Sequence, residues 1–206
     1  MSVATAGLRE RKKQQTRQDI FDASQRLFAR HGFEKVTVAA IARAANVSEM
    51  TVFNHFPTKE DLFYGGMQDF EHQLLEAVRT RRRGQTALDA FRYRVLEGAS
   101  TLDSPERAAA IVRSGRVIAA SPSLQARERQ IVDVYTERLA ELLPGDVEAA
   151  VAAAALMAAH RALVVFTRRQ AAAGERGPAL AGAFRTQAGR VFGRLERGLG
   201  GYAARA

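Results

Sequence analysis

Helix-stopping residues divide this chain into segments of helix length, and this division restricts its fold more than any other feature. The breaks "LDSP", "ASPS", "LPGD" and "AGERGP" each contain Pro or Gly. Because β-branched residues nowhere gather into alternating runs bounded by turns, strands are not expected. The pattern predicts an all-α protein of about nine helices, at about 16–31, 37–45, 48–55, 58–82, 86–102, 105–120, 123–143, 146–173 and 178–199.

The second and third predicted helices are short and nearly adjacent, within "VTVAAIARAANVSEMTVFNHFPTKEDLF" at residues 36–63. A helix-turn-helix needs a small residue where its helices cross, and Ala42 fits that position. Its turn needs a residue that tolerates a left-handed backbone, which Asn46 supplies. Val52 is placed to reach back to the core beside Ile41, and Phe56 follows one turn later. The stretch therefore predicts a helix-turn-helix.

The residues that this geometry turns outward have side chains suited to DNA. They are Glu49, Met50, Thr51, Asn54 and His55, with Lys59 at the start of the next helix. Asn can pair with adenine, Met can contact a thymine methyl group, and Glu can accept from cytosine N4. Thr and His suit phosphate oxygens, and Lys offers the DNA backbone a charge. A pair of short helices that merely pack is the alternative interpretation.

Composition sets further limits. Lys and Arg number 31 against 22 acids, a net charge of +9, which favours an anionic partner, either nucleic acid or a membrane surface. An arginine-rich composition of the source would also produce this charge. The lack of cysteine excludes disulfides and thiol chemistry. No secretory signal is seen, and the Ala-rich residues 147–166 are typical of a buried soluble helix, so a cytoplasmic protein without a membrane partner is expected.

Residues 16–63 resemble the DNA-binding domain of the tetracycline-repressor (TetR) family of bacterial transcription regulators. The resemblance rests on Ala23, Phe28, Gly32, Phe33, Thr37, Ile41, Ala42, Val47, Ser48, Thr51, Phe53, Phe56, Lys59, Asp61 and Leu62. It covers less than a third of the chain. Three positions depart from the family: Asn46 replaces a usual Gly, Phe53 a usual Tyr, and Met50 stands where Gly or Pro is frequent.

The chain is expected to divide into a basic N-terminal arm (1–15), of which residues 1–12 should be mobile, a DNA-binding domain (16–62), and a remainder (63–206) that the resemblance implies is an effector-binding and dimerisation domain. The candidate DNA-binding residues are Thr37, Val38, Ser48, Glu49, Met50, Thr51, Phe53, Asn54, His55 and Lys59, of which Val38 and Phe53 come from the resemblance alone. Arg9, Arg11 and Lys12 of the arm either enter the minor groove or form a solvated charge run.

The last two predicted helices carry apolar stripes. Their members are Val151, Ala155, Ala158, Ala162, Val165, Leu180, Phe184, Val191 and Leu195. Such a stripe usually faces the core of its own chain, whereas the resemblance implies a homodimer interface here. A twofold dimer would suit a palindromic operator, because its recognition helices must reach successive major grooves.

The resemblance implies a homodimeric repressor that a small-molecule effector releases from double-stranded DNA. The effector and its site are not identified; Phe91, Tyr93, Arg94, Arg113, Tyr135 and His160 could line the site or serve as core and surface residues. The basic charge keeps a non-specific architectural DNA-binding protein as the alternative. Enzyme activity, a cofactor and a metal site are not expected, because the sequence has no phosphate loop, nucleophile–base signature or metal-ligand spacing.

Overall fold

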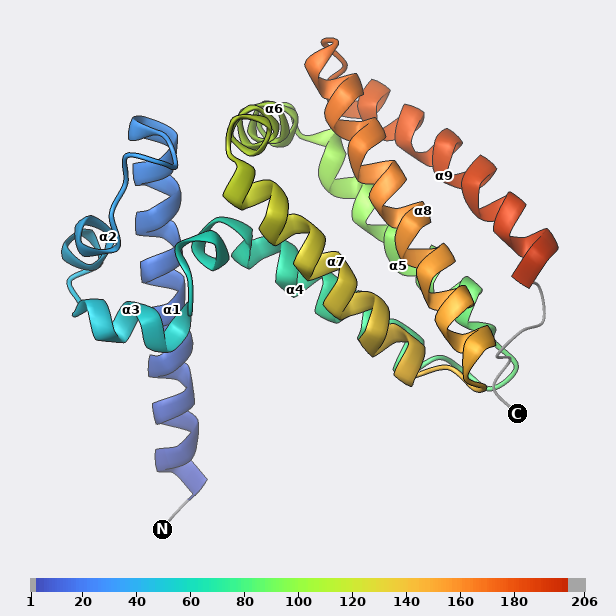
Figure 1. The fold of residues 1–206 in the computed structure, drawn as a ribbon, viewed down its shortest axis with the longest axis horizontal. Coiled ribbons are helices and arrows are strands. Elements are labelled where there is room, and N and C mark those ends of the chain that lie inside the picture. The colour runs from blue at the N-terminus through green and yellow to red at the C-terminus, as the bar shows by residue number, and fades with distance from the viewer. Residues whose placement is uncertain (1–2, 200–206) are drawn as a thin grey trace.

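The computed structural model describes residues 3–199, apart from the side chains of 3–6, 8, 66–68 and 199, and contains only helices within that range (Figure 1). The elements are α1 (Val3–His31), α2 (Val38–Ala44), α3 (Glu49–His55), α4 (Lys59–Arg79), α5 (Ala87–Glu97), the 3-10 helix η1 (Gly98–Asp103), α6 (Pro105–Ala120), α7 (Pro122–Glu141), α8 (Val147–Ala172) and α9 (Gly177–Leu199). The all-α prediction is confirmed.

Most helices begin where a side chain can satisfy their first free backbone N–H groups. Thr37, Ser48, Thr58, Thr86, Ser104 and Ser121 each accept a hydrogen bond from the backbone N–H three residues later. At Thr58 the arrangement is reciprocal, because the Asp61 carboxylate also accepts from the Thr58 N–H. Such caps fix helix starts locally, which is why the sequence predicted them well.

Helix α1 differs from the prediction, because it begins at Val3 and replaces the mobile arm expected before residue 16. Thr16, where the first helix was predicted to begin, lies inside α1 and does not cap it. Thr16 Oγ1 instead donates to the Lys12 carbonyl at 2.9 Å, and Gln15 Nε2 donates to Asp19 Oδ1 at 2.8 Å. These bonds between residues four apart continue the helix toward the N-terminus. Residues 1 and 2 lie outside the described part.

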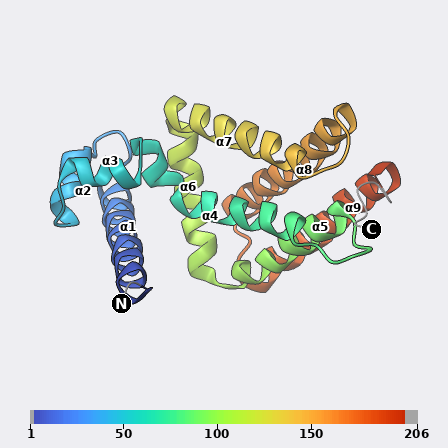
Figure 2. The same cartoon turned by 90° about the horizontal axis from the view of Figure 1, so that it is seen from below.

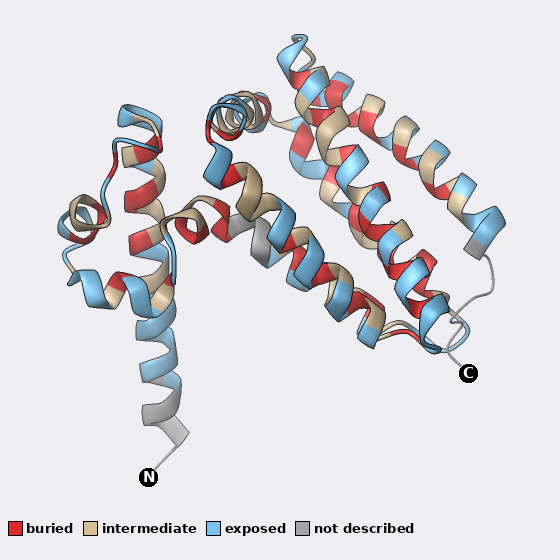
Figure 3. Ribbon diagram, viewed as in Figure 1, coloured by how far each residue is buried: buried red, intermediate tan, exposed pale blue. Residues whose placement is uncertain are grey.

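The helices form two groups, with α1–α3 at one end of the molecule and α5–α9 at the other (Figures 1 and 2). Helix α4 belongs to both, because its start packs on α1 and its remainder packs on α5 and α7. Beyond it, α8 lies against both α7 and α9. Buried residues follow the faces that the helices turn toward one another, whereas the N-terminal part of α1 is exposed (Figure 3).

Helix α8 is the central helix of the C-terminal group. Ala152, Ala153 and Ala159 are buried along it, and such small side chains let helices approach closely. By length and composition alone α8 would also suit a membrane span. It is nevertheless packed between α7 and α9, and Leu156 and Leu163 are almost fully buried there.

Candidate nucleic-acid interface

The turn between α2 and α3 has the geometry that the sequence predicted. Asn46 has φ 53°, the left-handed backbone that a tight turn requires. The Val47 N–H donates to the Ala42 carbonyl at 2.9 Å and closes the turn. Ala42 is buried where the helices cross, and Val52 and Phe56 fill the core beneath α3. The chain therefore forms a helix-turn-helix with α3 in the position of the recognition helix.

Helix α3 presents an unusual exposed face. The Met50 side chain is 69% exposed and that of Phe53 is 44% exposed, and Glu49 and Asn54 are also exposed. Phe53 and Asn54 follow Met50 by three and four residues, so both lie on the same side of the helix as Met50. Met50 and Phe53 can contact the methyl groups of thymine bases, and the Asn54 amide can hydrogen-bond to base edges.

The hydroxyl groups beside this face are occupied in holding the helices. Ser48 Oγ accepts from the Thr51 N–H at 3.0 Å and hydrogen-bonds Thr51 Oγ1 at 2.8 Å. Thr37 Oγ1 accepts from the Ala40 N–H at 3.2 Å, and Val38 next to it is half-buried. The caps place the N-terminal ends of both short helices at the surface, where exposed N–H groups and dipoles favour phosphate.

Lys59 lies inside the domain, where its bonds are to the protein. Its ammonium group donates to the carbonyls of Phe33 and Val36 at 3.1 and 3.4 Å. It also lies over the Phe33 ring, 4.2 Å from the centroid. Lys59 therefore ties the start of α4 to the connection between α1 and α2, a role that its sequence position did not indicate.

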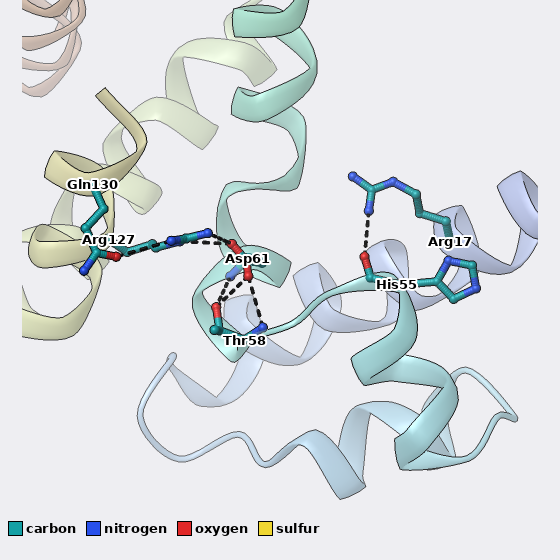
Figure 4. Close-up of polar contacts among 6 residues, drawn as sticks. All are labelled: Arg17, His55, Thr58, Asp61, Arg127 and Gln130. Atoms are coloured by element: carbon teal, nitrogen blue, oxygen red, sulfur yellow. Dashed lines mark hydrogen bonds and ion pairs between the residues drawn. The ribbon is translucent and has the colours of Figure 1, made fainter. Parts of the chain in front are cut away.

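Sequence reasoning missed a basic contribution from α1. Arg17 Nη1 donates to the His55 carbonyl at 3.3 Å, and its guanidinium lies 4.3 Å from the centre of the Phe56 ring (Figure 4). Burial lowers the pKa of His55, and the positive charges of Lys13 and Arg17 lower it further. His55 therefore favours its neutral form at pH 7 and can offer DNA one donor and one acceptor. Lys13 and Arg17 are four residues apart, a spacing that places both on one face of α1.

A charged contact joins this domain to the C-terminal helices (Figure 4). Asp61 Oδ1 accepts from Arg127 of α7 at 3.0 Å from Nε and 2.6 Å from Nη2, while Oδ2 accepts from the N–H and hydroxyl of Thr58. Arg127 also donates to Gln130 at 3.2 Å. Although burial raises the pKa of Asp61, the hydrogen bonds from Thr58 and Arg127 and the charge of Arg127 outweigh it, so the pKa is lowered.

A second polar contact crosses the same junction. The Ser121 hydroxyl, which caps α7, donates to the carboxylate of Glu34 in the connection after α1 at 2.6 Å. Tyr64 of α4 donates to the Leu124 carbonyl of α7 at 2.9 Å. With Asp61 and Arg127, these bonds fix the first turns of α7 against the helix-turn-helix and the start of α4.

Residues 20–64, which comprise this helix-turn-helix with the adjoining parts of α1 and α4, match the family model described as "Bacterial regulatory proteins, tetR family". This stretch is therefore similar to the DNA-binding domain of TetR-family regulators. The regulator TcmR of Streptomyces glaucescens is 34% identical over 85 residues, which are 41% of this chain and 38% of TcmR. The alignment thus spans less than half of that relative's length.

Solved structures resemble nearly the whole chain. NalD of Pseudomonas aeruginosa, titled the secondary repressor of the MexAB-OprM multidrug efflux pump, has a TM-score of 0.52 at 21% identity and covers 91% of this chain and 97% of its own. A structure titled SmeT-Triclosan complex has a TM-score of 0.55 at 17% identity and covers 89% and 90%. Both likenesses show that the fold of this chain, with its two groups of helices, also occurs in solved structures.

The candidate dimer residues divide into two sets. On α8, Val151 is 59% exposed, Ala158 and Ala162 are exposed, and Ala155 and Val165 are half-buried. On α9, Val191 and Leu195 are half-buried, but Leu180 is fully buried and Phe184 is 8% exposed. Placing Leu180 and Phe184 on an exposed dimer surface is therefore corrected, because their stripe packs into the core of its own protomer.

The outer side of α9 has a different character. Gly182 and Gly193 are half-buried, Thr186 and Gly189 are exposed, and a Cβ built on any of these three glycines would meet no neighbouring atom. These positions recur every three or four residues, so they share one face of α9. The surface beside α8 is thus lined by residues without bulk, which would allow another helix to come close.

The six effector-site candidates do not gather at one place. Phe91 is fully buried and contacts His160, whereas Tyr93 is 67% exposed and Arg113 is also exposed. A cavity of about 220 Å³ lies instead between α1 and α4, beside Arg17 and Phe56. Among the described residues, no group of three or more His, Cys, Asp or Glu could hold a metal ion.

Proposed function

We propose that this protein is a homodimeric, cytoplasmic transcriptional repressor that binds a palindromic operator and is released by a small-molecule effector. The observation that carries the proposal is the exposed face of α3, with Met50, Phe53 and Asn54 side by side on a capped helix-turn-helix. Exposed apolar groups of this size add nothing to folding, and they suit contact with base edges.

Each residue of the face has a proposed partner on DNA. The Asn54 amide pairs with adenine, Met50 and Phe53 contact thymine methyl groups, and Glu49 accepts from cytosine N4. Thr37, Val38, Ser48, Thr51 and His55 lie against phosphate and sugar and set the register of α3 in the groove. Lys59 acts indirectly by holding α4 against the connection after α1.

Dimerisation uses the exposed face of α8 and the small-residue face of α9. Val147 and Val151 are 68% and 59% exposed at the start of α8, and Ala158 and Ala162 continue the same side. A twofold axis here presents two copies of α3, and a spacing of about 34 Å between them would match one turn of DNA.

Effector control requires that a conformational change in the C-terminal helices also changes the position of the helix-turn-helix. The contacts of Asp61 with Arg127 and of Glu34 with Ser121 supply such a connection. A shift of α7 on effector binding would pull on the first turn of α4 and change the separation of the two recognition helices. That NalD is titled a repressor and SmeT is titled as a triclosan complex supports this assignment.

The test is selection of genomic fragments by the purified protein at about 0.15 M salt with competitor DNA, where purely electrostatic binding is weak. Recovery of one palindromic motif is the expected result; Asn54→Ala should recover it with a relaxed preference at one base pair, and the C-terminal variant Tyr93→Ala should recover it unchanged. Broad recovery without a motif would instead support a non-specific architectural protein, for which the net charge of +9 is the favouring observation.

A further inference from the structure

Glu71 of α4 is a buried acid that the packing of the helices does not explain. Its side chain is 2% exposed, and Oε2 has no hydrogen-bond partner among the groups that the structure describes. A carboxylate that loses water normally gains a donor or a cation in exchange. A leucine would fill a similar space without this cost, so the acid points to a purpose other than folding.

The polar groups near Glu71 have partners of their own. On α7, Glu128 forms an ion pair of 2.8 Å with Arg168 of α8, and the Tyr135 hydroxyl is 3.1 Å from His72 Nδ1. Glu128 is near enough for its charge to act on Glu71, and the charge of Glu71 acts in turn on Tyr135. Arg168 is engaged by Glu128, and the charge that acts on Glu71 is the negative charge of Glu128, so an ionised Glu71 lacks a counter-charge.

Burial raises the pKa of Glu71 to about 8, and the charge of Glu128 adds to the effect. Without a ligand, the carboxyl group is therefore mostly protonated at pH 7. A cation placed beside it would reverse this balance, because an adjacent positive charge favours the ionised form.

We propose that Glu71 is the anchor of an effector site between α4 and α7, and that the effector is a small organic base whose cationic nitrogen binds the Glu71 carboxylate. This inference rests on the proposed function, since it names the ligand class of the repressor. An anionic ligand would face the negative charge of Glu128, and a neutral one would gain no charge attraction from Glu71, which stays protonated beside it.

The position of Glu71 also connects the ligand to the DNA-binding end. Glu128 directly follows Arg127 on α7, and Arg127 holds Asp61 in the first turn of α4. Glu71 lies further along that same α4. A cation bound between Glu71 and α7 therefore acts on the two helices that the contact of Asp61 with Arg127 joins, so binding would shift that contact.

The proposal predicts how affinity depends on pH. Binding a cation ionises Glu71 and releases its proton, so the affinity for a permanently charged base rises about tenfold per pH unit below the pKa of Glu71 and levels off above it.

The charged and titratable groups that face α4 are Arg17 of α1, Arg94 of α5, Arg127, Glu128, Tyr135 and Arg138 of α7, and His160 and Arg168 of α8. His72 of α4 itself also faces this region, so the variant His72→Gln isolates the contribution of Glu71.

The experiment measures binding of matched probes to the full-length protein at pH 8 by calorimetry. The probes are benzylamine, 1-naphthylmethylamine and benzamidine, with 1-naphthalenemethanol and 1-naphthoic acid as the neutral and anionic counterparts. At least one base should bind tenfold or more tightly than both counterparts. Glu71→Gln should remove that preference, whereas Glu137→Gln, at an exposed position of α7, should retain it.

Three results would overturn the inference: no base binds at millimolar concentration, a base binds no better than the alcohol, or Glu71→Gln binds it as well as the wild type. Should Glu71→Gln fail to fold, the pH profile of His72→Gln with benzamidine decides, because a flat profile between pH 6 and 8 excludes Glu71. Recovery of an operator motif without base binding would refute only this inference. Base binding by a protein that selects no motif would refute only the proposed function.

Discussion

The helix-turn-helix and the C-terminal helices use the same secondary structure under different constraints. Helices α2 and α3 have seven residues each, too few to be stable alone, so each depends on its cap, its turn and one or two buried anchors. Helices α8 and α9 have 26 and 23 residues and bury long stripes. The stability of the first region therefore depends on single residues, whereas that of the second depends on the whole apolar face of each helix.

The largest expected effect tests this difference in the core of the helix-turn-helix. Phe56→Ala removes a ring that is 2% exposed and should lower the free energy of unfolding by about 3–5 kcal/mol in urea denaturation. Tyr93→Ala, at an exposed C-terminal aromatic, should change it by less than about 0.5 kcal/mol. Similar losses from the two variants would contradict the comparison.

The proposed dimer surface gives the next effect. Val151→Asp places like charges near the twofold axis on α8 and should weaken dimerisation by about 3 kcal/mol, measured by sedimentation at varied concentration. Val134→Asp is the control, because Val134 is a similarly exposed valine on α7. An unchanged dimer in Val151→Asp would place the interface elsewhere.

The contact between the two regions should contribute less. Arg127→Ala removes the guanidinium from a nearly buried Asp61 and should cost about 1.5 kcal/mol, after allowance for the partial exposure of Arg127. Arg129→Ala, exposed on the same helix, is the control.

The same pair predicts a pH dependence. Because the pKa of Asp61 is lowered in the folded state, its stabilisation is fully present above the ordinary aspartate pKa and is lost as pH falls through the lowered value. Acid titration of stability should therefore be shallower below about pH 4 in Arg127→Ala than in the wild type. Identical acid profiles would show that the ion pair adds nothing to folding.

Recognition should be separable from stability on α3. Asn54→Ala should weaken binding to the selected operator by about 1–3 kcal/mol and relax the preference at one base pair. Its urea midpoint should stay that of the wild type, because Asn54 is exposed. A loss that is equal on all DNA sequences would assign Asn54 to phosphate rather than to a base.

The smallest effect concerns the turn. Asn46→Ala puts a side chain without local hydrogen bonding at φ 53° and should cost about 1 kcal/mol, whereas Asn46→Gly should be neutral or slightly stabilising. Thermal unfolding of the pair measures the difference. If the alanine variant is as stable as the glycine variant, the backbone conformation of the turn does not determine the stability of this region.

The sequence predicted features that neighbouring residues determine. The caps Thr37, Ser48 and Thr58, the turn at Asn46 and the bounds of α6 all depend on chemistry within a few residues. The start of α1 was missed because a helical extension and a charged arm have the same polar composition, and no stop signal separates them.

Long-range pairing could not be read from the chain. Asp61 is visible as part of a capping box, but its bond to Arg127 joins residues 66 positions apart. Likewise, periodicity finds the stripe containing Leu180 and Phe184 and cannot tell whether the same protomer or a partner covers it. Glu71 was missed because a lone acid within a helix gives no sign of burial.

The long helix α1 has a consequence for how its amide protons exchange with solvent. Residues 9–15 are exposed all round, whereas Ile20, Ala23 and Phe28 are buried. Backbone hydrogen bonds that only local helix formation protects should open often, and those above the core should open only when the domain unfolds. Deuterium uptake along this single helix should therefore fall steeply between Lys13 and Ile20. Any partner that touches the charged end would slow exchange there first.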